Sequence, residues 1–483
     1  MSSGSALVIG AGLAGLSAGI TLAQAGWQVT VLESHTRPGG LLQPFTRHGL
    51  RCETGFHFIT DGGPGGCFRR ILAHLGVRNR LDLLPPDPAA QFVLHRTGLE
   101  PIIVPCELPQ VRASLSARWP GQAAALGRFL DRVEDLLSCS GWLGAVAGLS
   151  RALPREADTL GQVLAACGVD GEAAEALRGL AGMLALDVGG DLRYTDYATV
   201  VGSALRGSWR LRGGGGALVA ALADRLRALG GILHTGRPAT RLVWDDRQLT
   251  AVEDAAGGQH RPEITVFTAH PTELLRLGGE GIVRPSFATR LNDLPDGPGA
   301  VIAYLPSRSA AAVLGPRHHL LQDEAGQRLY AVAPAAFDAG EPALLELLAW
   351  VDCGEVAPWA DSRIGRRPPA YRAWKQAHIE RLLATVQARF PALTVDGPRW
   401  ACSPLTFRDY TRTRHGAALG YAHNLSGLAG DPIPVRNRLR NLLLTGQNIS
   451  HPGILGVLIG AVDLAGRIAG RDSERAVAEA DGA

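Results

Sequence analysis

Apolar positions near the start of the chain follow two different spacings. Residues 6–9 and 28–32 are short apolar runs of the kind that form buried strands. Between them, apolar side chains recur with helical spacing as far as Ala25, and Gly26 ends that pattern. The order strand, helix, strand predicts a βαβ unit whose two strands lie parallel in one sheet.

The same two spacings recur along the rest of the chain. Short apolar runs separated by turns fill residues 295–355 and predict an antiparallel sheet, which we expect to form the floor of a substrate cavity. Apolar residues with helical spacing predict a helix over 371–390. Further helices are predicted over 121–149, 159–186, 217–229 and 451–469, and further strands over 232–234, 239–244, 265–267 and 441–444.

The composition is that of an ordinary globular protein. The 483 residues are 46% hydrophobic and 19% charged, with a formal net charge of +3, so nucleic acid is not indicated as a partner. The seven cysteines are scattered and contain no C-x-x-C pair, which indicates neither a disulfide framework nor a metal site. No signal peptide precedes the first strand, so a cytoplasmic protein is expected.

The turn between the first strand and the helix has the spacing Gly10-x-Gly12-x-x-Gly15. Gly10 permits a tight turn, Gly12 leaves space for a pyrophosphate, and Gly15 lets the helix and the strand approach closely. The helix N-terminus offers unpaired N–H groups to the phosphates. Glu33 stands 18 residues after Gly15, where an acid accepts hydrogen bonds from a ribose. Together these residues predict a dinucleotide-binding site.

A second glycine element follows the acid. Arg37, Gly39 and Gly40 form an R-x-G-G sequence that a simple NAD-binding domain does not need. With it, residues 10–40 resemble the FAD-binding N-terminus of the amine oxidase and phytoene desaturase group, although Gly19 stands where that group usually has alanine. The resemblance implies an α/β fold, with a Rossmann-like two-dinucleotide-binding domain that holds FAD.

Residues 49–58 resemble the phytoene desaturase and retinol saturase branch of this group. That branch reads roughly G-x-x-x-D-x-G-x-H, and this chain has Glu53 in place of the aspartate, followed by Gly55 and His57. The resemblance implies that Gly55 lets backbone pass close to the flavin. His57 is a candidate active-site acid or base, and a hydrogen-bonded structural histidine is the alternative.

Two later segments extend the resemblance. The four glycines at 213–216 and the helix after them resemble the second FAD segment of the family, in which backbone near Ala239 would reach the adenine. The strand, turn and helix of 441–470 would place a helix N-terminus under the flavin, with His451 beside it. The residues expected to contact FAD are Gly10, Gly12, Leu13, Ala14, Gly15, Glu33, Arg37, Gly39, Gly40, Ala239, Gly446, Gln447, Asn448, Pro452, Gly453 and Ile454.

Residues 403–421 resemble the stretch that lines the substrate side of the flavin in the retinol saturase-like branch. Four polar side chains in or next to this stretch are candidates to face the cavity, and each has a purely structural role as the alternative. They are Arg408, His415, Tyr421 and His423.

The resemblance divides the chain into two domains and a tail. Residues 1–64, 205–275 and 436–471 are expected to form a discontinuous FAD-binding domain. Residues 65–204 and 276–435 are expected to form an inserted α+β substrate domain, in which the apolar run at 142–149 is either core or a surface for a membrane or a greasy substrate. Residues 472–483 are expected to form a flexible tail.

The implied activity is an FAD-dependent oxidation or reduction of carbon–carbon double bonds in a hydrophobic polyene or isoprenoid-type substrate. Desaturation, saturation and reductive cyclisation each pair a hydride transfer at flavin N5 with a proton, for which His57, Tyr421 and His451 are the candidates. Bacterial relatives of this branch include carotenoid enzymes and cyclases of polyene tetramate macrolactams, so a biosynthetic role is expected by analogy. NADPH is a candidate transient electron donor, since the chain has no second nucleotide fingerprint.

Two other functions stay open. Flavin amine oxidases resemble the same FAD segments but commonly use a lysine near flavin N5, whereas Lys375, the only lysine, lies away from every flavin motif. Rab GDP-dissociation inhibitors resemble the fold and carry prenylated proteins without FAD, but the intact motifs at 37–40 and 446–453 indicate that flavin is kept here. A greasy substrate also makes peripheral contact with the inner membrane reasonable. The oligomeric state is not indicated.

Overall fold

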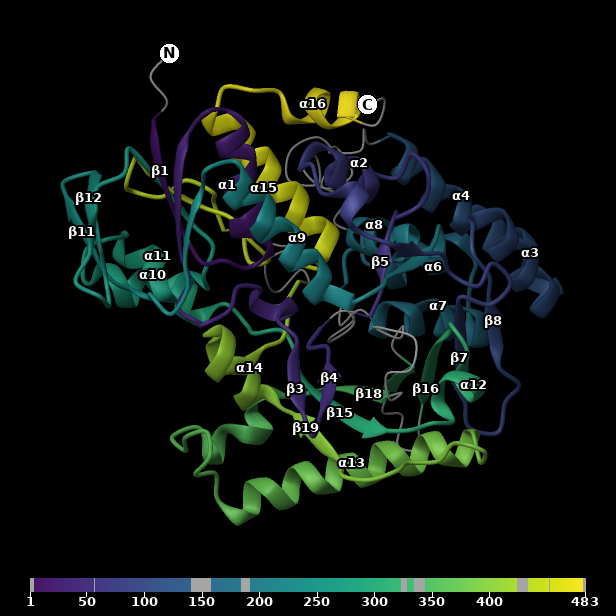
Figure 1. The fold of residues 1–483 in the computed structure, drawn as a ribbon. Coiled ribbons are helices and arrows are strands. Elements are labelled where there is room, and N and C mark those ends of the chain that lie inside the picture. The colour runs from purple at the N-terminus through teal and green to yellow at the C-terminus, as the bar shows by residue number, and fades with distance from the viewer. Residues whose placement is uncertain are drawn as a thin grey trace.

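The computed structural model describes residues 4–55, 57–139, 158–183, 192–322, 328–333, 344–423, 433–450 and 452–480. Two β-sheets organise these residues, and Figure 1 shows the first of them with its helices in the upper half and the second in the lower half. Each sheet has its own buried apolar layers on both faces.

The first sheet contains the predicted βαβ unit. Its five strands are all parallel, in the order β10-β2-β1-β14-β20. Ile9 at the end of β1 pairs with Leu32 at the end of β2, so the glycine turn and Glu33 leave the sheet at the same edge. The strands are β1 Ser5–Ile9, β2 Gln28–Leu32, β10 Ile232–His234, β14 Ile264–Phe267 and β20 Leu442–Leu444.

Both faces of the first sheet are buried, which explains why β1 carries no charge. Ala6 and Val8 pack with the helices α1, α9 and α15, which lie side by side in Figure 1. Leu7 and Ile9 point to the other face, where they pack with β11, β12 and α10. These elements are α1 Leu13–Gln24, α9 Gly214–Ala228, α15 Ile454–Ile468, β11 Ala239–Asp245, β12 Gln248–Asp254, β13 Gln259–His260, α10 Pro271–Gly278 and α11 Pro285–Asp293.

The second sheet is mixed, with seven strands in the order β19-β15-β18-β17-β16-β7-β8. Its four middle strands, β15 to β18, are antiparallel and confirm the sheet predicted for residues 295–355. Strands β7 and β8 were not predicted, because no element was assigned to residues 92–104. Strand β7 pairs in parallel with β16 and antiparallel with β8. The strands are β7 Phe92–Arg96, β8 Ile102–Val104, β15 Gly299–Pro306, β16 His318–Gln322, β17 Arg328–Val332, β18 Leu344–Val351 and β19 Trp400–Cys402.

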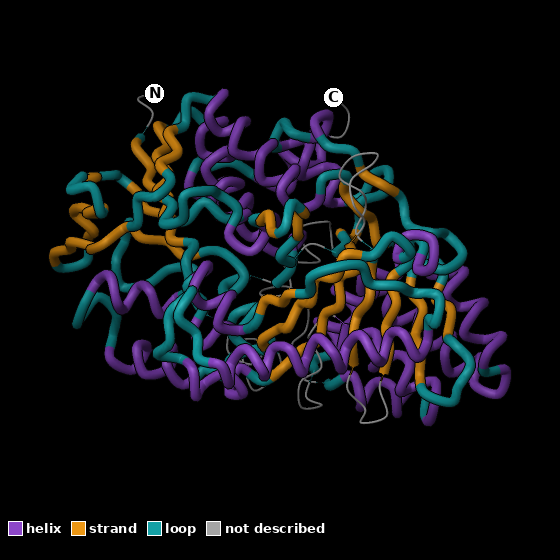
Figure 2. Tube along the Cα trace, turned by 60° about the horizontal axis from the view of Figure 1, so that its bottom comes forward, coloured by secondary structure: helices purple, strands orange, loops and turns teal. Residues whose placement is uncertain are grey.

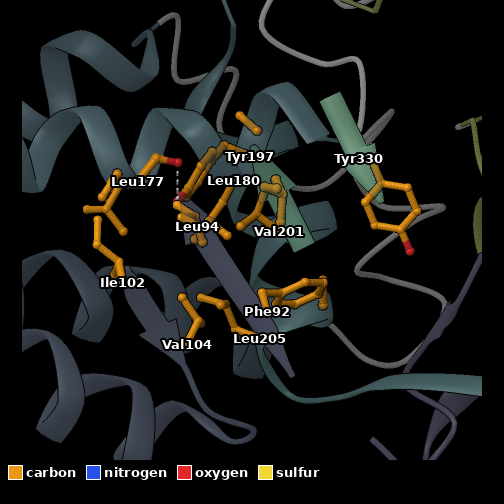
Figure 3. Close-up of a cluster of buried hydrophobic side chains, with 14 of the residues drawn as sticks. Phe92, Leu94, Ile102, Val104, Leu177, Leu180, Tyr197, Val201, Leu205 and Tyr330 are labelled. Atoms are coloured by element: carbon orange, nitrogen blue, oxygen red, sulfur yellow. Dashed lines mark hydrogen bonds between the residues drawn. The ribbon is translucent and has the colours of Figure 1, made fainter. Parts of the chain in front are cut away.

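Helices cover both faces of the second sheet. The long helix α13 crosses one face, as Figure 2 shows, and confirms the helix predicted for 371–390. The other face packs against a group of helices through the apolar cluster in Figure 3, in which Phe92 and Leu94 of β7 contact side chains of α7 and α8. The helices are α13 Pro369–Arg389, α4 Ala123–Cys139, α6 Leu160–Cys167, α7 Gly171–Met183 and α8 Tyr194–Leu205.

The remaining described elements are short. They are β3 Phe45–Arg47, β4 Leu50–Cys52, β5 Ile59–Thr60, α2 Cys67–His74, β6 Leu83–Leu84, α3 Leu108–Arg118, β9 Ser208–Leu211, α12 Ala310–Leu314, α14 Pro404–Thr411 and α16 Ser473–Glu479.

Two predicted helices differ from the structure. The helix predicted over 159–186 is two helices, α6 and α7, because Gly168 ends α6 in the left-handed region with φ +74°. The helix predicted over 121–149 is described as far as Cys139, where α4 ends. The apolar run at 142–149 lies outside the described residues.

The expected flexible tail is wrong for the part that forms α16. This helix packs against α2 and α15, its Val477 is fully buried, and the Ser473 hydroxyl donates to the Val462 carbonyl. The predicted domain boundary after residue 64 also separates α2 from its neighbours, since Phe68 and Ile71 of α2 lie in the core of the first sheet. The other domain boundaries stay predictions.

Several properties of the described residues bear on chemistry. Their cysteines outside α4 are free thiols. No three histidine, cysteine or carboxylate side chains gather there as a metal site would require. None of the described helices combines the length and the apolar character needed to cross a bilayer.

Candidate functional site

The glycine turn lies at the carboxyl end of β1 and is sterically tight. Gly10 has φ +104°, which favours glycine. A methyl group on Gly15 would lie 1.9 Å from the Gly10 carbonyl oxygen, whereas one on Gly12 would meet only the Cα atom of Gly40, at 3.9 Å. Gly10 and Gly15 are therefore required by the fold itself, and Gly12 is not.

Glu33 reaches the glycine turn from the end of β2. One of its carboxylate oxygens accepts a hydrogen bond of 2.7 Å from the Ala11 N–H, and the other accepts one of 2.8 Å from the His35 N–H. The side chain is buried against the turn. The acid thus lies beside the turn that would hold the pyrophosphate, as a dinucleotide site requires.

The R-x-G-G element closes over the turn. The Gly39 N–H donates to the Ala11 carbonyl oxygen at 2.9 Å, and Gly39 forms a bridge with Gly12. Arg37 is exposed, and its backbone N–H donates to the His35 ring. A methyl group on Gly40 would lie 3.4 Å from the Gly12 Cα and fill the space over Gly12, whereas one on Gly39 would crowd Gln43 at 3.1 Å.

The C-terminal segment meets the same turn from the other side. Gly446 has φ +115°, and a methyl group there would lie 3.9 Å from the Ala14 Cβ at the start of α1. The Asn448 side chain turns away to accept a hydrogen bond from the Tyr421 N–H at 2.9 Å. Gln447 is half-buried between them. Segments more than 400 residues apart thus meet at one end of the first sheet.

Ala239 is the first residue of β11 and lies near Glu33, the acid that follows β2. It is buried in the same apolar cluster as Leu32, and the preceding loop is bonded to residues 33–35 through the N–H groups of Gly236 and Arg237. Backbone near Ala239 therefore lies on the Glu33 side of the site, where the resemblance places the adenine.

A largely apolar cavity of about 230 Å³ lies where the two sheets meet. The first turn of α15 lines one part of it, with Pro452, Gly453 and Ile454. Thr54, Gly55, His57 and Phe58 line a second part. The second sheet forms the floor through Ala300, Ile302, Tyr330, Leu348 and Trp350.

His57 lies at the wall of this cavity and has unusual surroundings. Its Nδ1 atom is 3.6 Å from Oε2 of Glu346, and its ring centroid is 5.0 Å from that of Tyr330. Neither ring nitrogen has a hydrogen-bond partner among the described residues. Burial, and then the charge of Arg210, lowers the pKa of His57 to about 4. The imidazole is therefore neutral near pH 7, and the structural-histidine alternative lacks the hydrogen bonds it needs.

Glu346 was not identified from the sequence. It is a single acid inside the apolar strand Leu344–Val351, and its side chain is only 2% exposed. Burial raises the pKa of Glu346 well above its usual value, and the nearby Glu53 carboxylate adds to the shift. An isolated carboxyl group in an apolar strand was the signal that could have found it.

Glu53 connects the cavity wall to the glycine-rich turn before α9. Its Oε2 atom accepts a hydrogen bond of 2.9 Å from the Gly215 N–H, and a methyl group on Gly214 would lie 2.4 Å from its carboxyl carbon. The Tyr304 hydroxyl donates to the Glu53 carbonyl oxygen at 2.5 Å. Glu53 therefore anchors the cavity wall through two hydrogen bonds, one made by its side chain and one by its backbone carbonyl.

A second buried polar group lies behind the cavity. The Tyr330 hydroxyl is hydrogen-bonded to Nδ1 of His318, whose pKa is lowered well below its usual value by burial. Arg210 is buried and donates to the carbonyl oxygens of Ala333 and Arg317. The Tyr330 hydroxyl is thus held by a neutral histidine, close to a buried cation.

The expectation that Tyr421 faces the cavity is wrong. Its side chain is fully buried in the core of the first sheet, and its hydroxyl donates to the Leu291 carbonyl oxygen at 2.6 Å. The side chain points the other way because Gly420 packs directly on Asn448. Tyr421 is thereby removed from the candidates for proton transfer.

The other polar candidates do not reach the cavity either. Arg408 pairs with Asp409 and with the Ala360 carbonyl, and His415 is largely exposed and pairs with Asp296. His423 is absent from the cavity lining. His451 lies outside the described residues.

Lys375 cannot serve as a lysine beside the flavin. It lies on α13 and donates to the Ala401 carbonyl oxygen at 2.8 Å, on the face of the second sheet opposite the cavity. The arrangement on which the amine oxidase alternative depended is therefore missing.

The residues of the site fit a flavin dinucleotide. Gly12 has room for a methyl group in the protein alone, so the empty space above it suits a ligand rather than a side chain. Glu33, the N-terminus of α1 and the N-terminus of α15 supply a ribose acceptor and two sets of N–H donors around that space.

Residues 13–274 match the family model described as flavin containing amine oxidoreductase. The chain belongs to this family. It is therefore an FAD-dependent oxidoreductase.

Individual relatives indicate the branch of the family to which the chain is most similar. All-trans-retinol 13,14-reductase from Macaca fascicularis is 24% identical over 94% of this chain and 84% of its own length, and the Homo sapiens enzyme is 23% identical over the same shares. Hydroxyneurosporene desaturase from Rhodobacter capsulatus is 28% identical over 56% of each chain. These similarities support the retinol saturase and phytoene desaturase-like branch.

Solved structures share the fold. An oxidoreductase from Methanosarcina mazei is 14% identical and superposes with a TM-score of 0.68 over 95% of this chain and 99% of its own. A putrescine oxidase variant is 16% identical with a TM-score of 0.66 over 97% and 98%. At these identities the comparison shows the fold alone, and it confirms the predicted α/β flavoprotein architecture.

Proposed function

We propose that this protein is an FAD-dependent oxidoreductase that acts on carbon–carbon double bonds of a hydrophobic polyene or isoprenoid-type substrate. The observation that carries the proposal is the apolar cavity between the first turn of α15 and the second sheet, with His57 as a polar side chain in its wall. An apolar lining with few polar groups suits a hydrocarbon chain.

The chain's own residues have separable parts in this reaction. Gly12, Gly39 and Gly40 would admit the pyrophosphate, Glu33 would hold the ribose, and the N–H groups at the start of α15 would favour negative charge beside the cavity. When bound, FAD supplies the redox chemistry by exchanging a hydride with the substrate. The apolar walls exclude water, and His57 handles the proton that accompanies the hydride.

Saturation of a double bond is the direction we favour. The retinol reductases match nearly the whole chain, whereas the desaturase matches 56% of it. Desaturation and reductive cyclisation would likewise pair a hydride transfer with the movement of a proton in the same cavity. A bacterial pathway to a carotenoid or a polyene tetramate macrolactam would supply substrates for these reactions. NADPH would be a transient donor of electrons.

An anaerobic spectrum of the purified protein, followed by product analysis, tests the proposal. The protein should carry a flavin band, and bleaching by NADPH would identify that nucleotide as the donor. With the flavin reduced by dithionite, all-trans-retinol should gain two hydrogens by mass, and with the flavin oxidised a carotenoid polyene that loses two would indicate desaturation. His57→Gln should keep the flavin and lower turnover by about 100-fold.

The two alternatives predict different results in the same assay. A colourless protein that binds prenyl lipids would support a carrier. A yellow protein that makes hydrogen peroxide from putrescine or cyclohexylamine and leaves both polyenes unchanged would support an amine oxidase and overturn the proposal. Peripheral membrane contact stays a prediction, for which binding to vesicles is the test.

A further inference from the structure

We infer that Glu346 is a positioning residue for His57, so that the two side chains together hold one transferable proton at the wall of the cavity. The inference rests on the proposed function, because it assigns the group that supplies the proton in double-bond reduction. It adds a residue from the second sheet to a site whose other members belong to the cofactor motifs.

The geometry singles out this pair. The Nδ1 atom of His57 and the Oε2 atom of Glu346 are 3.6 Å apart, and both are buried without a hydrogen-bond partner among the described residues. A buried polar atom without a hydrogen-bond partner destabilises the fold, and here two of them face each other. A small approach of the imidazole would satisfy both atoms with one hydrogen bond.

The same carboxyl group also fixes the backbone that carries His57. The Glu53 N–H donates to the Glu346 carboxyl group, and the Tyr304 hydroxyl donates to the Glu53 carbonyl oxygen. Tyr304 and Glu346 are direct neighbours in the pairing of β15 with β18. Glu346 therefore contacts the segment 53–57 at both of its ends, which sets the position of the imidazole relative to the cavity.

Burial decides how many protons the pair holds. Burial favours the uncharged form of each side chain, a protonated Glu346 and a neutral His57, and the positive charge of Arg210 further disfavours a protonated His57. A neutral imidazole beside a carboxylic acid holds the same number of protons as an imidazolium beside a carboxylate. The pair thus holds one transferable proton in either arrangement.

The resulting step balances. Reduction of the double bond needs one hydride and one proton, and bound FAD, reduced by an external donor, would supply the hydride to one carbon. His57 gives the proton of one ring nitrogen to the other carbon, and the Glu346 carboxyl proton moves to Nδ1 of His57. The carbon–carbon double bond becomes a single bond, two C–H bonds form, and Glu346 remains as a carboxylate until water returns a proton.

Infrared spectroscopy of the protein without substrate tests the pair directly. At about pH 8, where the Glu53 carboxyl group with its pKa of about 7 is mostly ionised, the wild-type protein should show the C=O stretch of a buried carboxylic acid, and that band should be missing in Glu346→Gln. The exposed acid variant Glu280→Gln, matched in chemistry, should keep the band. If the band is equally strong in Glu346→Gln, or absent from the wild type at that pH, the inference is overturned.

Turnover separates a proton-supplying role from a merely structural one. Glu346→Gln, with flavin content unchanged, should lower kcat by at least about tenfold while KM changes little, and Glu346→Asp should recover part of the loss. Turnover of Glu346→Gln within twofold of the wild type would contradict the inference. If Glu346→Gln does not fold, His57→Gln provides the test, since removing the imidazole should shift the frequency of the Glu346 band.

The two proposals fail in distinguishable ways. If no polyene is converted but the infrared band behaves as described, the proposed function is wrong and the proton-holding pair stands. If all-trans-retinol is reduced at the same rate by Glu346→Gln, the proposed function stands and the assignment of Glu346 is wrong.

Discussion

The Oε2 atom of Glu53 lies 2.9 Å from the backbone nitrogen of Gly215, and this hydrogen bond joins two motifs that are 162 residues apart. Both motifs were recognised separately in the sequence, one for the flavin side of the cavity and one for the second FAD segment. Their contact means that the wall carrying His57 is anchored to the N-terminus of α9. The Glu53 carboxyl group fits against this turn because Gly214 and Gly215 have no side chains that would occupy its place.

The Glu53 carboxyl group should make stability depend on pH. Burial raises its pKa from 4.5 to about 7, although hydrogen bonds from Gly215 and Gly216 and the charge of Arg51 oppose the shift. A group whose pKa is raised in the folded state stabilises the protein below pH 4.5 and loses that contribution as the pH rises to about 7. Relative to Glu53→Gln, the free energy of unfolding of the wild type should fall by roughly 3 kcal/mol across that window. Urea denaturation of the flavin-free proteins at a series of pH values measures this, and curves that stay parallel would contradict it.

Gly12 and Gly15 should respond differently to the same substitution. Gly12→Ala places its methyl group in ordinary contact with Gly40, so thermal unfolding of the flavin-free protein should change by less than about 0.5 kcal/mol while FAD binding weakens by about tenfold or more. Gly15→Ala forces a methyl group to 1.9 Å from the Gly10 oxygen and should destabilise the fold by about 2 to 3 kcal/mol. Circular dichroism and flavin titration give the two readouts. Equal loss of stability in both variants would show that Gly12 is a packing residue.

Tyr421→Phe should affect stability and leave catalysis intact. The substitution removes the buried hydroxyl that donates to the Leu291 carbonyl oxygen, and that oxygen then keeps only its hydrogen bond from the Arg414 guanidinium. The expected cost is about 1 to 2 kcal/mol of unfolding free energy, with turnover within about twofold of the wild type. His57→Gln in the same assay provides the contrast. A large loss of kcat in a well-folded Tyr421→Phe protein would restore the tyrosine as a proton donor.

The helix α16 should contribute to the stability of the first sheet. Val477→Ala removes two buried methyl groups from the contact with α2 and α15 and should cost roughly 2 kcal/mol. The exposed neighbour Ala478 gives a control, since Ala478→Ser should change little. Thermal melting of the three proteins decides whether residues 473–479 are part of the folded unit. A Val477→Ala protein as stable as the wild type would mean that the helix adds nothing.

The dinucleotide-binding fingerprint could be predicted because all of its residues lie close together in the sequence. The turn Gly10 to Gly15, the helix after it and Glu33 all lie within 24 consecutive residues. Their periodicity was enough to predict the first two strands and the edge of the sheet at which the turn lies. The order of the remaining strands was not accessible in this way. Strand β7 has a sequence of only five residues and becomes a strand because β16, more than 200 residues later, pairs with it.

The cavity could be predicted only in part for the same reason. His57 was found through its motif, but Glu346 belongs to no motif and reaches His57 only because β18 pairs with β15. Tyr421 was misassigned because glycine spacing does not determine which way a neighbouring side chain points. The contact between Gly420 and Asn448, which turns Tyr421 into the core, depends on a turn 27 residues later.

The parallel strand β20 has a consequence for how the protein is made. The first sheet, the Gly446 turn and the start of α15 are complete only after more than 450 residues have been synthesised. A nascent chain can form the βαβ unit early, but it lacks the helix N-terminus that lines the cavity. Cofactor capture must therefore follow synthesis of almost the whole chain, whereas the second sheet and its covering helices are complete by Cys402.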